Sequence, residues 1–260
     1  MKKIYIHTDL EGISGIDKGH MLNKDGDDYR YCVERLMADT NAAIDGAFLG
    51  GADSVTVLDS HGGGNNFYLS LLDKRAEFDL KKNKKWWGCL DSSYWGSFFI
   101  GAHAMAGTIN GFLDHTQDSE QILNYYINDR PVGELGQWAM VCAYYEVPLI
   151  MMSGDRAAVN EASQFFSGIE TAEVKTGISR MEARLIDSKI AEDLIRQAAK
   201  KAVEKEHRTA LFQPLLPMEI KIDFTRADYC DNVVMADSKI ERLNARTILK
   251  ISSSYQDFWI

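Results

Sequence analysis

The strongest constraint on this chain is a short apolar run that ends in two closely spaced carboxylates. Residues 2–6 read Lys-Lys-Ile-Tyr-Ile, and residues 9–15 read Asp-Leu-Glu-Gly-Ile-Ser-Gly. The β-branched and aromatic run predicts a buried strand. Side chains at i and i+2 share a face of an extended chain, so Asp9 and Glu11 should converge at the strand's carboxyl end. Two carboxylates held together repel each other unless a cation lies between them, which predicts a metal site.

The next segments predict a strand–helix–strand unit. Apolar residues recur at helical spacing over residues 29–49, and Gly50-Gly51 marks the end of that helix. Residues 54–58 then predict a second strand, which is followed by Asp59-Ser60-His61. Two strands joined in this way should be parallel and adjacent, so both deliver polar groups to the same edge of the sheet, where ligands bind in open α/β folds.

The rest of the chain continues this pattern and then loosens. Further strands are predicted over residues 97–101 and 147–152, with a hairpin within 124–134 and helices over 134–145 and 155–166. We therefore expect an α/β fold, with an open, mostly parallel sheet flanked by helices and a smaller α+β C-terminal subdomain. Residues 1–180 should form the catalytic metal-binding domain and residues 181–260 the subdomain.

Composition excludes several classes of function. The chain has 260 residues, 38 acidic against 29 basic side chains and a formal net charge of −9, which disfavours a nucleic-acid partner. Its four cysteines form no C-x-x-C pair, so no zinc ribbon or redox motif is expected. No targeting segment and no apolar run of membrane-spanning length is apparent, so we expect a cytoplasmic protein with no membrane partner.

Candidate metal ligands come from the ends of the predicted elements. Three successive strands are followed by carboxylates or imidazoles, and the helix after the hairpin begins with a glutamate. The set is Asp9, Glu11, His61, His103 and Glu134. Three carboxylates and two imidazoles suit zinc or a similar divalent ion. Five ligands are too many for one tetrahedral ion that keeps a position open, so two ions sharing Asp9 are expected, and paired metals activate water and polarise carbonyl or phosphoryl oxygens.

Each candidate also has an ordinary structural explanation. A D-x-E pair is common, and a histidine at a strand end is more often a surface or core residue. Glu134 could simply be a favourable charge at a helix N-terminus. The set stands out because every member falls at one predicted edge of the sheet.

Two further histidines have open roles. His115 lies in a loop and could act as a general base or nucleophile, with a surface histidine as the equal alternative. By strict alternation His7 shares a face with Asp9, so it is either a core residue or a support for the ligands.

Several blocks of the sequence resemble, in order and spacing, the DppA family of D-aminopeptidases, which are dinuclear zinc metallopeptidases. They are residues 9–15, 59–61, 101–104, 114–116 and 126–136. The resemblance implies that Asp9, Glu11, His61, His103 and Glu134 bind two Zn²⁺ ions per subunit. It also implies that His115 is the catalytic nucleophile or base. The family's ring-like homo-oligomer, such as a decamer, implies active sites facing an internal chamber.

The function expected from these observations is a zinc-dependent aminopeptidase. It would hydrolyse the N-terminal residue, of D configuration by the resemblance, from short peptides such as D-Ala-D-Ala. Two alternatives stay open: a two-metal phosphoesterase, and a non-catalytic peptide- or metal-binding protein. Arg130 and Asn128 are the only nearby groups that could hold a phosphate.

Overall fold

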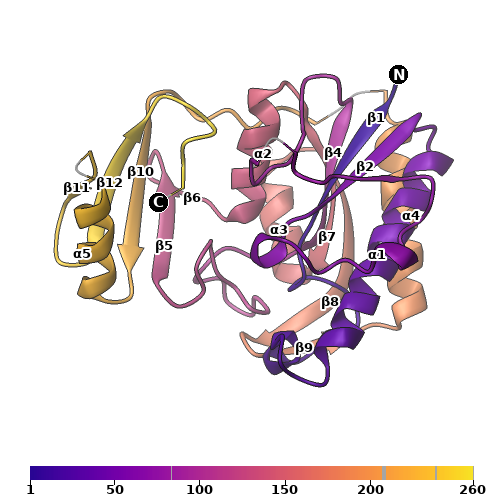
Figure 1. Ribbon diagram of the computed structural model, residues 1–260, viewed down its shortest axis with the longest axis horizontal. Coiled ribbons are helices and arrows are strands. Elements are labelled where there is room, and N and C mark those ends of the chain that lie inside the picture. The colour runs from indigo at the N-terminus through magenta and orange to yellow at the C-terminus, as the bar shows by residue number, and fades with distance from the viewer. Residues whose placement is uncertain (83, 207–208, 238, 260) are drawn as a thin grey trace.

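The computed structural model describes residues 1–82, 84–206, 209–237 and 239–259 (Figure 1). The strands are β1 (Lys3–Thr8), β2 (Ser54–Asp59), β3 (Glu77–Phe78), β4 (Gly96–Ala102), β5 (Ile122–Ile127), β6 (Arg130–Pro131), β7 (Leu149–Asp155), β8 (Glu170–Ser179), β9 (Glu182–Leu185), β10 (Met218–Phe224), β11 (Glu241–Arg242) and β12 (Thr247–Ser252). The α-helices are α1 (Tyr29–Leu49), α2 (Glu134–Tyr144), α3 (Arg156–Phe165), α4 (Ser188–Glu204) and α5 (Ala227–Ala236). Short 3₁₀ turns are η1 (Gly19–Leu22), η2 (His61–Gly63) and η3 (Leu69–Leu71).

The larger sheet has seven strands in the order β3-β2-β1-β4-β7-β8-β9. All neighbouring pairs are parallel except β8 and β9, so the predicted open, mostly parallel sheet is confirmed. The chain moves outward from β1 through β2 to β3, and then returns to place β4 on the other side of β1. This reversal of strand order between β1 and β4 is the point at which ligands bind in open α/β sheets.

The alternating side chains of β1 pack into two separate apolar cores, one on each face of the larger sheet. Ile4 and Ile6 pack on the face that α1 and α4 cover, whereas Tyr5 packs on the face that α2 covers. Figure 1 shows α2 on one side of the sheet and α1 and α4 on the other. Because both faces are covered, the central strands are apolar almost throughout, as expected for parallel strands.

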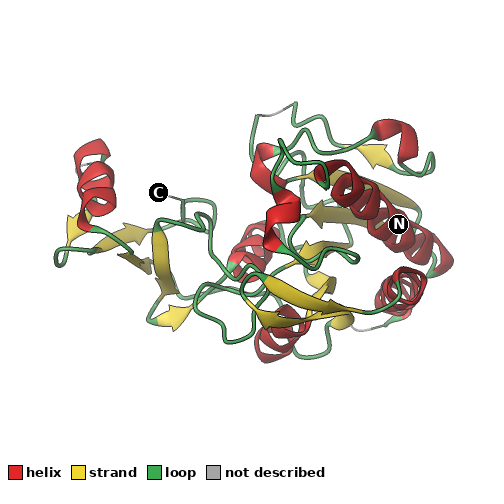
Figure 2. Ribbon diagram, turned by 90° about the horizontal axis from the view of Figure 1, so that it is seen from below, coloured by secondary structure: helices red, strands yellow, loops and turns green. Residues whose placement is uncertain are grey.

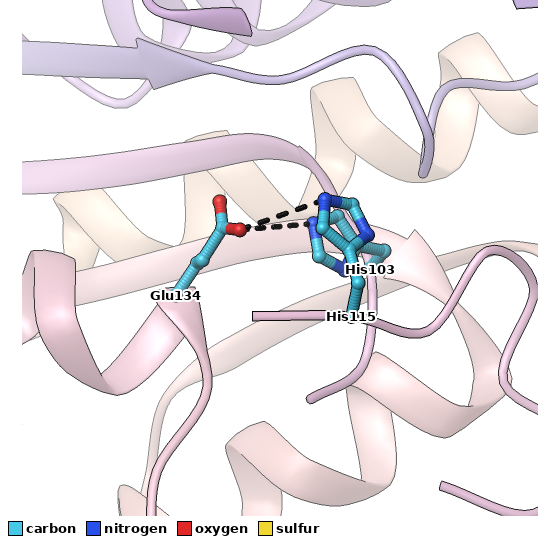
Figure 3. Close-up of side chains that lie close together, drawn as sticks. All are labelled: His103, His115 and Glu134. Carbon is cyan, nitrogen blue, oxygen red and sulfur yellow. Dashed lines mark ion pairs between the residues drawn. The ribbon is translucent and has the colours of Figure 1, made fainter. Parts of the chain in front are cut away.

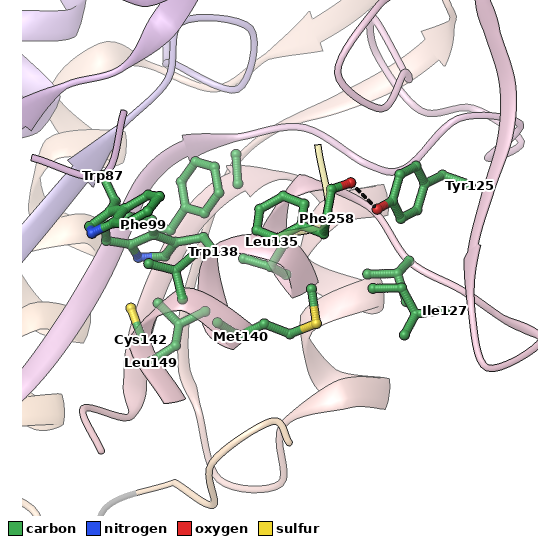
Figure 4. Close-up of a cluster of buried hydrophobic side chains, with 14 of the residues drawn as sticks. Trp87, Phe99, Tyr125, Ile127, Leu135, Trp138, Met140, Cys142, Leu149 and Phe258 are labelled. Atoms are coloured by element: carbon green, nitrogen blue, oxygen red, sulfur yellow. Dashed lines mark hydrogen bonds between the residues drawn. The ribbon is translucent and has the colours of Figure 1, made fainter. Parts of the chain in front are cut away.

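The second sheet is antiparallel, with the strand order β11-β12-β10-β5-β6. Figure 2 shows it, with α5, projecting from one side of the larger body. Helix α2 joins the two parts: its residues Leu135 and Met140 share an apolar cluster with Tyr125 and Ile127 of β5 (Figure 4). The C-terminal segment returns to the same cluster, where Tyr125 Oη donates to the carbonyl oxygen of Phe258 at 2.6 Å.

The domain boundary expected near residue 180 stays a prediction, but the two sheets do not divide the chain there. Strands β5 and β6 precede residue 180 and pair into the second sheet, because β10 pairs with β5. Helix α4 follows residue 180 and packs on α1 and β8 of the larger part. The smaller part is therefore assembled from two stretches of the chain that are far apart in sequence.

Candidate metal centre

Close contact between the ends of β1 and β4 creates the site. The backbone N–H of Asp9 donates to the carbonyl oxygen of Ile100 at 2.8 Å, and the N–H of Gly12 donates to that of Gly101 at 2.8 Å. A Cβ atom at position 12 would lie 2.0 Å from the carbonyl oxygen of Ala102. Only glycine fits there, which gives the Asp-Leu-Glu-Gly order a structural reason. The carboxylates after β1 are consequently held beside the residues that follow β4.

The first group of potential ligands consists of Asp9, Glu11 and His61. His61 Nδ1 lies 3.0 Å from Asp9 Oδ1 and 3.0 Å from Glu11 Oε2. Asp9 and Glu11 are buried, and the His61 side chain is 16% exposed, so the group opens to solvent on the His61 side. The donor atoms of the three residues all lie within 4.8 Å of one another, close enough to hold one ion.

The second group consists of His103, His115 and Glu134 (Figure 3). Nε2 of His103 and Nε2 of His115 each lie 3.7 Å from Glu134 Oε1. The two imidazole rings stack with centroids 3.9 Å apart and planes inclined by 8°. Glu134 begins α2, and its Oε1 accepts the backbone N–H of Gln117 at 2.7 Å, which ties the loop carrying His115 to that helix.

Asp9 connects the two groups and leaves unpaired atoms between them. Its Oδ1 faces His61, whereas its Oδ2 lies 3.4 Å from His103 Nε2. Within the described part of the chain, both Asp9 Oδ2 and His103 Nε2 are buried without a hydrogen-bond partner. Buried polar atoms normally have partners, and a divalent cation would satisfy a carboxylate oxygen and an imidazole nitrogen together. The donor set thus fits two ions that share Asp9.

The orientation of the histidines also fits metal binding. His103 Nδ1 donates to the carbonyl oxygen of Ala104 at 3.0 Å, and His115 Nδ1 donates to that of Leu113 at 2.7 Å. These bonds place the ring hydrogen on Nδ1 and leave the lone pair on Nε2, on the side of Glu134. Such backbone partners are usual behind metal-binding imidazoles.

The shifted pKa values of the buried groups show that the carboxylates of the site require positive charge beside them. Burial and the neighbouring charge of Glu11 raise the pKa of Asp9 to about 7. Burial lowers the pKa of His61, but Glu11 and Asp9 outweigh it and raise that pKa to about 11. Burial likewise opposes ionisation of Glu134, yet His103 holds the pKa of Glu134 at about 2. Without a cation, protons on the histidines must balance the carboxylates, which is the role that bound metal would take over.

His115 differs from His103 in two respects. Burial and the charge of His103 lower the pKa of His115 below its ordinary value, so its imidazole is neutral at pH 7. It also lines the pocket beside the carboxylates, whereas His103 is almost fully buried behind it. Of these two imidazoles, His115 is therefore the one that a substrate can reach. The donor atom of His115 also lies within 4.8 Å of those of His103 and Glu134, so His115 is beside the predicted ligands, and its catalytic role stays a prediction.

The pocket at this site has a volume of about 510 Å³ and is lined by aromatic side chains as well as by the carboxylates. The tryptophans among them are Trp86, Trp138 and Trp259. His7 also lines the pocket, with its ring stacked on Trp138 at a centroid distance of 4.3 Å, and burial lowers the pKa of His7 to about 3. His7 is thus a neutral core residue that also reaches the pocket.

Two buried charged side chains that support the site were not identified from the sequence. Lys175 of β8 is fully buried, and its Nζ donates to three carbonyls of the turn after β1, those of Glu11, Ile13 and Ile16, at 2.6, 2.9 and 2.9 Å. Glu161 of α3 is also buried, and its Oε2 accepts the N–H of Met105 at 2.8 Å. The helical spacing of Ala158, Glu161 and Ala162 is the sequence signal that could have identified Glu161, and in the structure all three are buried on one face of α3.

The chain is similar in sequence and in fold to known proteins. A family model described as D-aminopeptidase matches residues 1–259. The chain is 34% identical over 218 residues to a D-aminopeptidase from Bacillus subtilis (strain 168), which covers 83% of this chain and 77% of that protein. It also resembles the solved structure of the Zn-dependent D-aminopeptidase DppA from Bacillus subtilis, described as a self-compartmentalizing protease. That match has a TM-score of 0.91 and 28% sequence identity, and covers 98% of this chain and 93% of the other.

Among the described residues, no helix combines the length and apolar character needed to cross a bilayer.

Proposed function

The chain belongs to the D-aminopeptidase family, and from this premise we propose that it is a zinc-dependent aminopeptidase that removes an N-terminal D-amino acid from short peptides such as D-Ala-D-Ala. One observation carries the proposal. Asp9 Oδ2 and His103 Nε2 face each other, buried and unpaired, where two groups of potential metal ligands meet. The relative named as a D-aminopeptidase and the neighbour named as Zn-dependent support the same assignment.

The division of the donors into two groups supports the proposal of two zinc ions per subunit. Asp9, Glu11 and His61 would hold one ion, and Asp9, His103 and Glu134 the other. When bound, such a pair would more than offset the charge of the three carboxylates and would act as a Lewis acid toward a peptide carbonyl.

His115 would move the proton. Its Nε2 carries the free lone pair, because Nδ1 donates to the carbonyl oxygen of Leu113, and the lowered pKa keeps the ring neutral near pH 7. A neutral imidazole at the pocket wall can accept a proton from an attacking water and return it to the leaving amine as the C–N bond breaks. The alternative, direct attack by Nε2 on the carbonyl carbon, uses the same lone pair.

Replacing His115 with Ala tests this role. Turnover of D-Ala-D-Ala should fall by about 10²–10⁴-fold, whereas zinc content should stay at the wild-type level. His20→Ala, at an exposed histidine, is the matched control and should keep full activity. A His115→Ala enzyme with the wild-type rate would refute the assigned role.

Two substrate comparisons separate this function from its alternatives. D-Ala-D-Ala against L-Ala-L-Ala reports the stereochemical preference, and p-nitrophenyl phosphate reports phosphoesterase activity. The proposal requires faster hydrolysis of the D-peptide than of either competitor. Zinc binding without turnover of any of them would instead indicate a binding protein.

Assembly into a ring-like homo-oligomer, such as a decamer with the sites facing an interior chamber, is part of the proposal. Its support is the description of the similar structure as self-compartmentalizing. Light scattering on the purified protein would give the subunit number, and a monomer would exclude the chamber.

A further inference from the structure

Lys81 enters the pocket from the loop between β3 and β4. It lines the same pocket of about 510 Å³ as Asp9, Glu11 and His61, together with Trp86 from the same loop. A run of lysines at positions 81, 82, 84 and 85 suggests a solvated loop from sequence alone. In the structure, the first of these lysines is instead half-buried at the wall of the proposed active site.

The backbone around Lys81 is held in a defined conformation. Its φ is +49°, in the left-handed region that side-chain-bearing residues rarely adopt. Its N–H donates to Oδ1 of the buried Asp79 at 2.7 Å, and Asp79 Oδ2 accepts from Tyr5 Oη and from the N–H of Cys89. Such a conformation persists only where the surroundings impose it, and it is most frequent at ligand-binding sites. The buried Asp79 thus fixes the point from which the Lys81 side chain extends.

The Lys81 ammonium group has N–H donors that are not used by the protein. Its Nζ donates to the carbonyl oxygen of Gly63 at 3.1 Å, and among the described residues no carboxylate forms an ion pair with it. An ammonium group has three N–H donors, so two remain for a ligand. Gly63 lies two residues after His61, and both residues line the same pocket as Lys81, so these donors lie on the wall of the pocket that contains the first group of potential metal ligands.

The charges around the pocket are strongly unequal. Among the described residues that line it, Lys81 is the only lysine or arginine, whereas five are carboxylates: Asp9, Glu11, Asp118, Glu120 and Glu134. A short peptide carries one ammonium and one carboxylate group. The acidic side chains can attract its amine. With metal bound to the histidines, Lys81 is the lining cation, among the described residues, that can meet its carboxylate.

We propose that Lys81 binds the free C-terminal carboxylate of the substrate, and so makes the enzyme selective for dipeptides and similarly short peptides. This inference rests on the proposed peptidase function. An extended dipeptide spans roughly 7 Å, at about 3.3–3.6 Å per residue, so its carboxylate stays within the pocket that holds its scissile bond. The pocket volume also lies in the range of roughly 300–1,000 Å³ typical of small-molecule sites.

A substrate pair that differs only at the C-terminus tests this directly. The substrates are D-Ala-D-Ala and D-Ala-D-Ala amide, which lacks the negative charge, and kcat/KM is measured for both with the zinc-loaded enzyme. The wild type should prefer the free dipeptide by about ten-fold, the value of one charge-assisted hydrogen bond. Lys81→Met should lose that preference because kcat/KM falls for the dipeptide only. Its kcat/KM for the amide should stay within about two-fold of wild type.

Two further variants serve as controls. Lys81→Arg keeps the charge and should retain the preference for the dipeptide. Lys82→Met removes the same charge from the exposed neighbouring residue and should leave both substrates unchanged.

Several outcomes would overturn the inference. If the wild-type enzyme hydrolyses the dipeptide and the amide equally fast, that result alone overturns the inference. Equal losses on both substrates in Lys81→Met would mean that Lys81 only tethers the loop through Gly63, and no loss on either would mean that it has no role. Failure of the wild type to hydrolyse both substrates would instead count against the proposed function itself.

Discussion

Glu161 lends itself to a quantitative prediction because burial acts directly on its charge. It is 4% exposed, its Oε2 accepts one backbone N–H, and its Oε1 has no partner among the described residues. Burial raises its pKa from 4.5 to about 7. A carboxyl group with a raised folded-state pKa stabilises the fold fully below the unfolded pKa and loses that contribution as the pH rises through the folded pKa. The difference of 2.5 units corresponds to about 3 kcal/mol.

Glu161→Gln removes this titration while keeping the shape and an acceptor oxygen for Met105. Relative to wild type, the variant should gain about 3 kcal/mol of unfolding free energy between pH 4.5 and a pH well above 7. The assay is denaturant unfolding of the metal-free protein at fixed protein concentration, at pH 5 and pH 8.5. Glu34→Gln, at an exposed carboxylate of α1, is the control and should change by less than about 0.5 kcal/mol. If the difference between Glu161→Gln and wild type is the same at both pH values, the reasoning is wrong.

Two other substitutions test how the carboxylates are held. Gly12→Ala should destabilise the fold by about 2–4 kcal/mol and weaken zinc binding, because the new Cβ would lie 2.0 Å from the carbonyl oxygen of Ala102; unchanged unfolding in denaturant would contradict this. Lys175→Met should raise the zinc dissociation constant at the first ligand group by at least about ten-fold, because the turn carrying Glu11 loses three buried hydrogen bonds. Competition with a chelator measures this constant. A wild-type value would exclude the role assigned to Lys175.

Much of the larger sheet was predictable because its signals are local. The helix expected over residues 29–49 is α1 at the same bounds, and Asp155 caps α3 as its position before that helix suggests, accepting the N–H of Ala158. Each predicted ligand follows a predicted strand or begins a predicted helix. The parallel register of β1, β2 and β4 then brings these chain segments to one edge, as the strand–helix–strand pattern requires.

What the sequence could not show depends on contacts between distant residues. The second sheet forms because β10 pairs with β5, from Ile220 opposite Ile127 onward, and no local pattern encodes that pairing. Helix α5 and strand β9 were not predicted either. Lys175 and Lys81 looked like ordinary surface charges, because their partners are backbone carbonyls more than fifteen positions away in sequence.

The central claim is that two zinc ions share Asp9 between two groups of side chains. The most direct measurement is an anomalous difference map at the zinc edge, from crystals grown with zinc. We predict two peaks in each subunit, one among Asp9, Glu11 and His61 and one among Asp9, His103 and Glu134. A single peak, or peaks away from Asp9, would contradict the account.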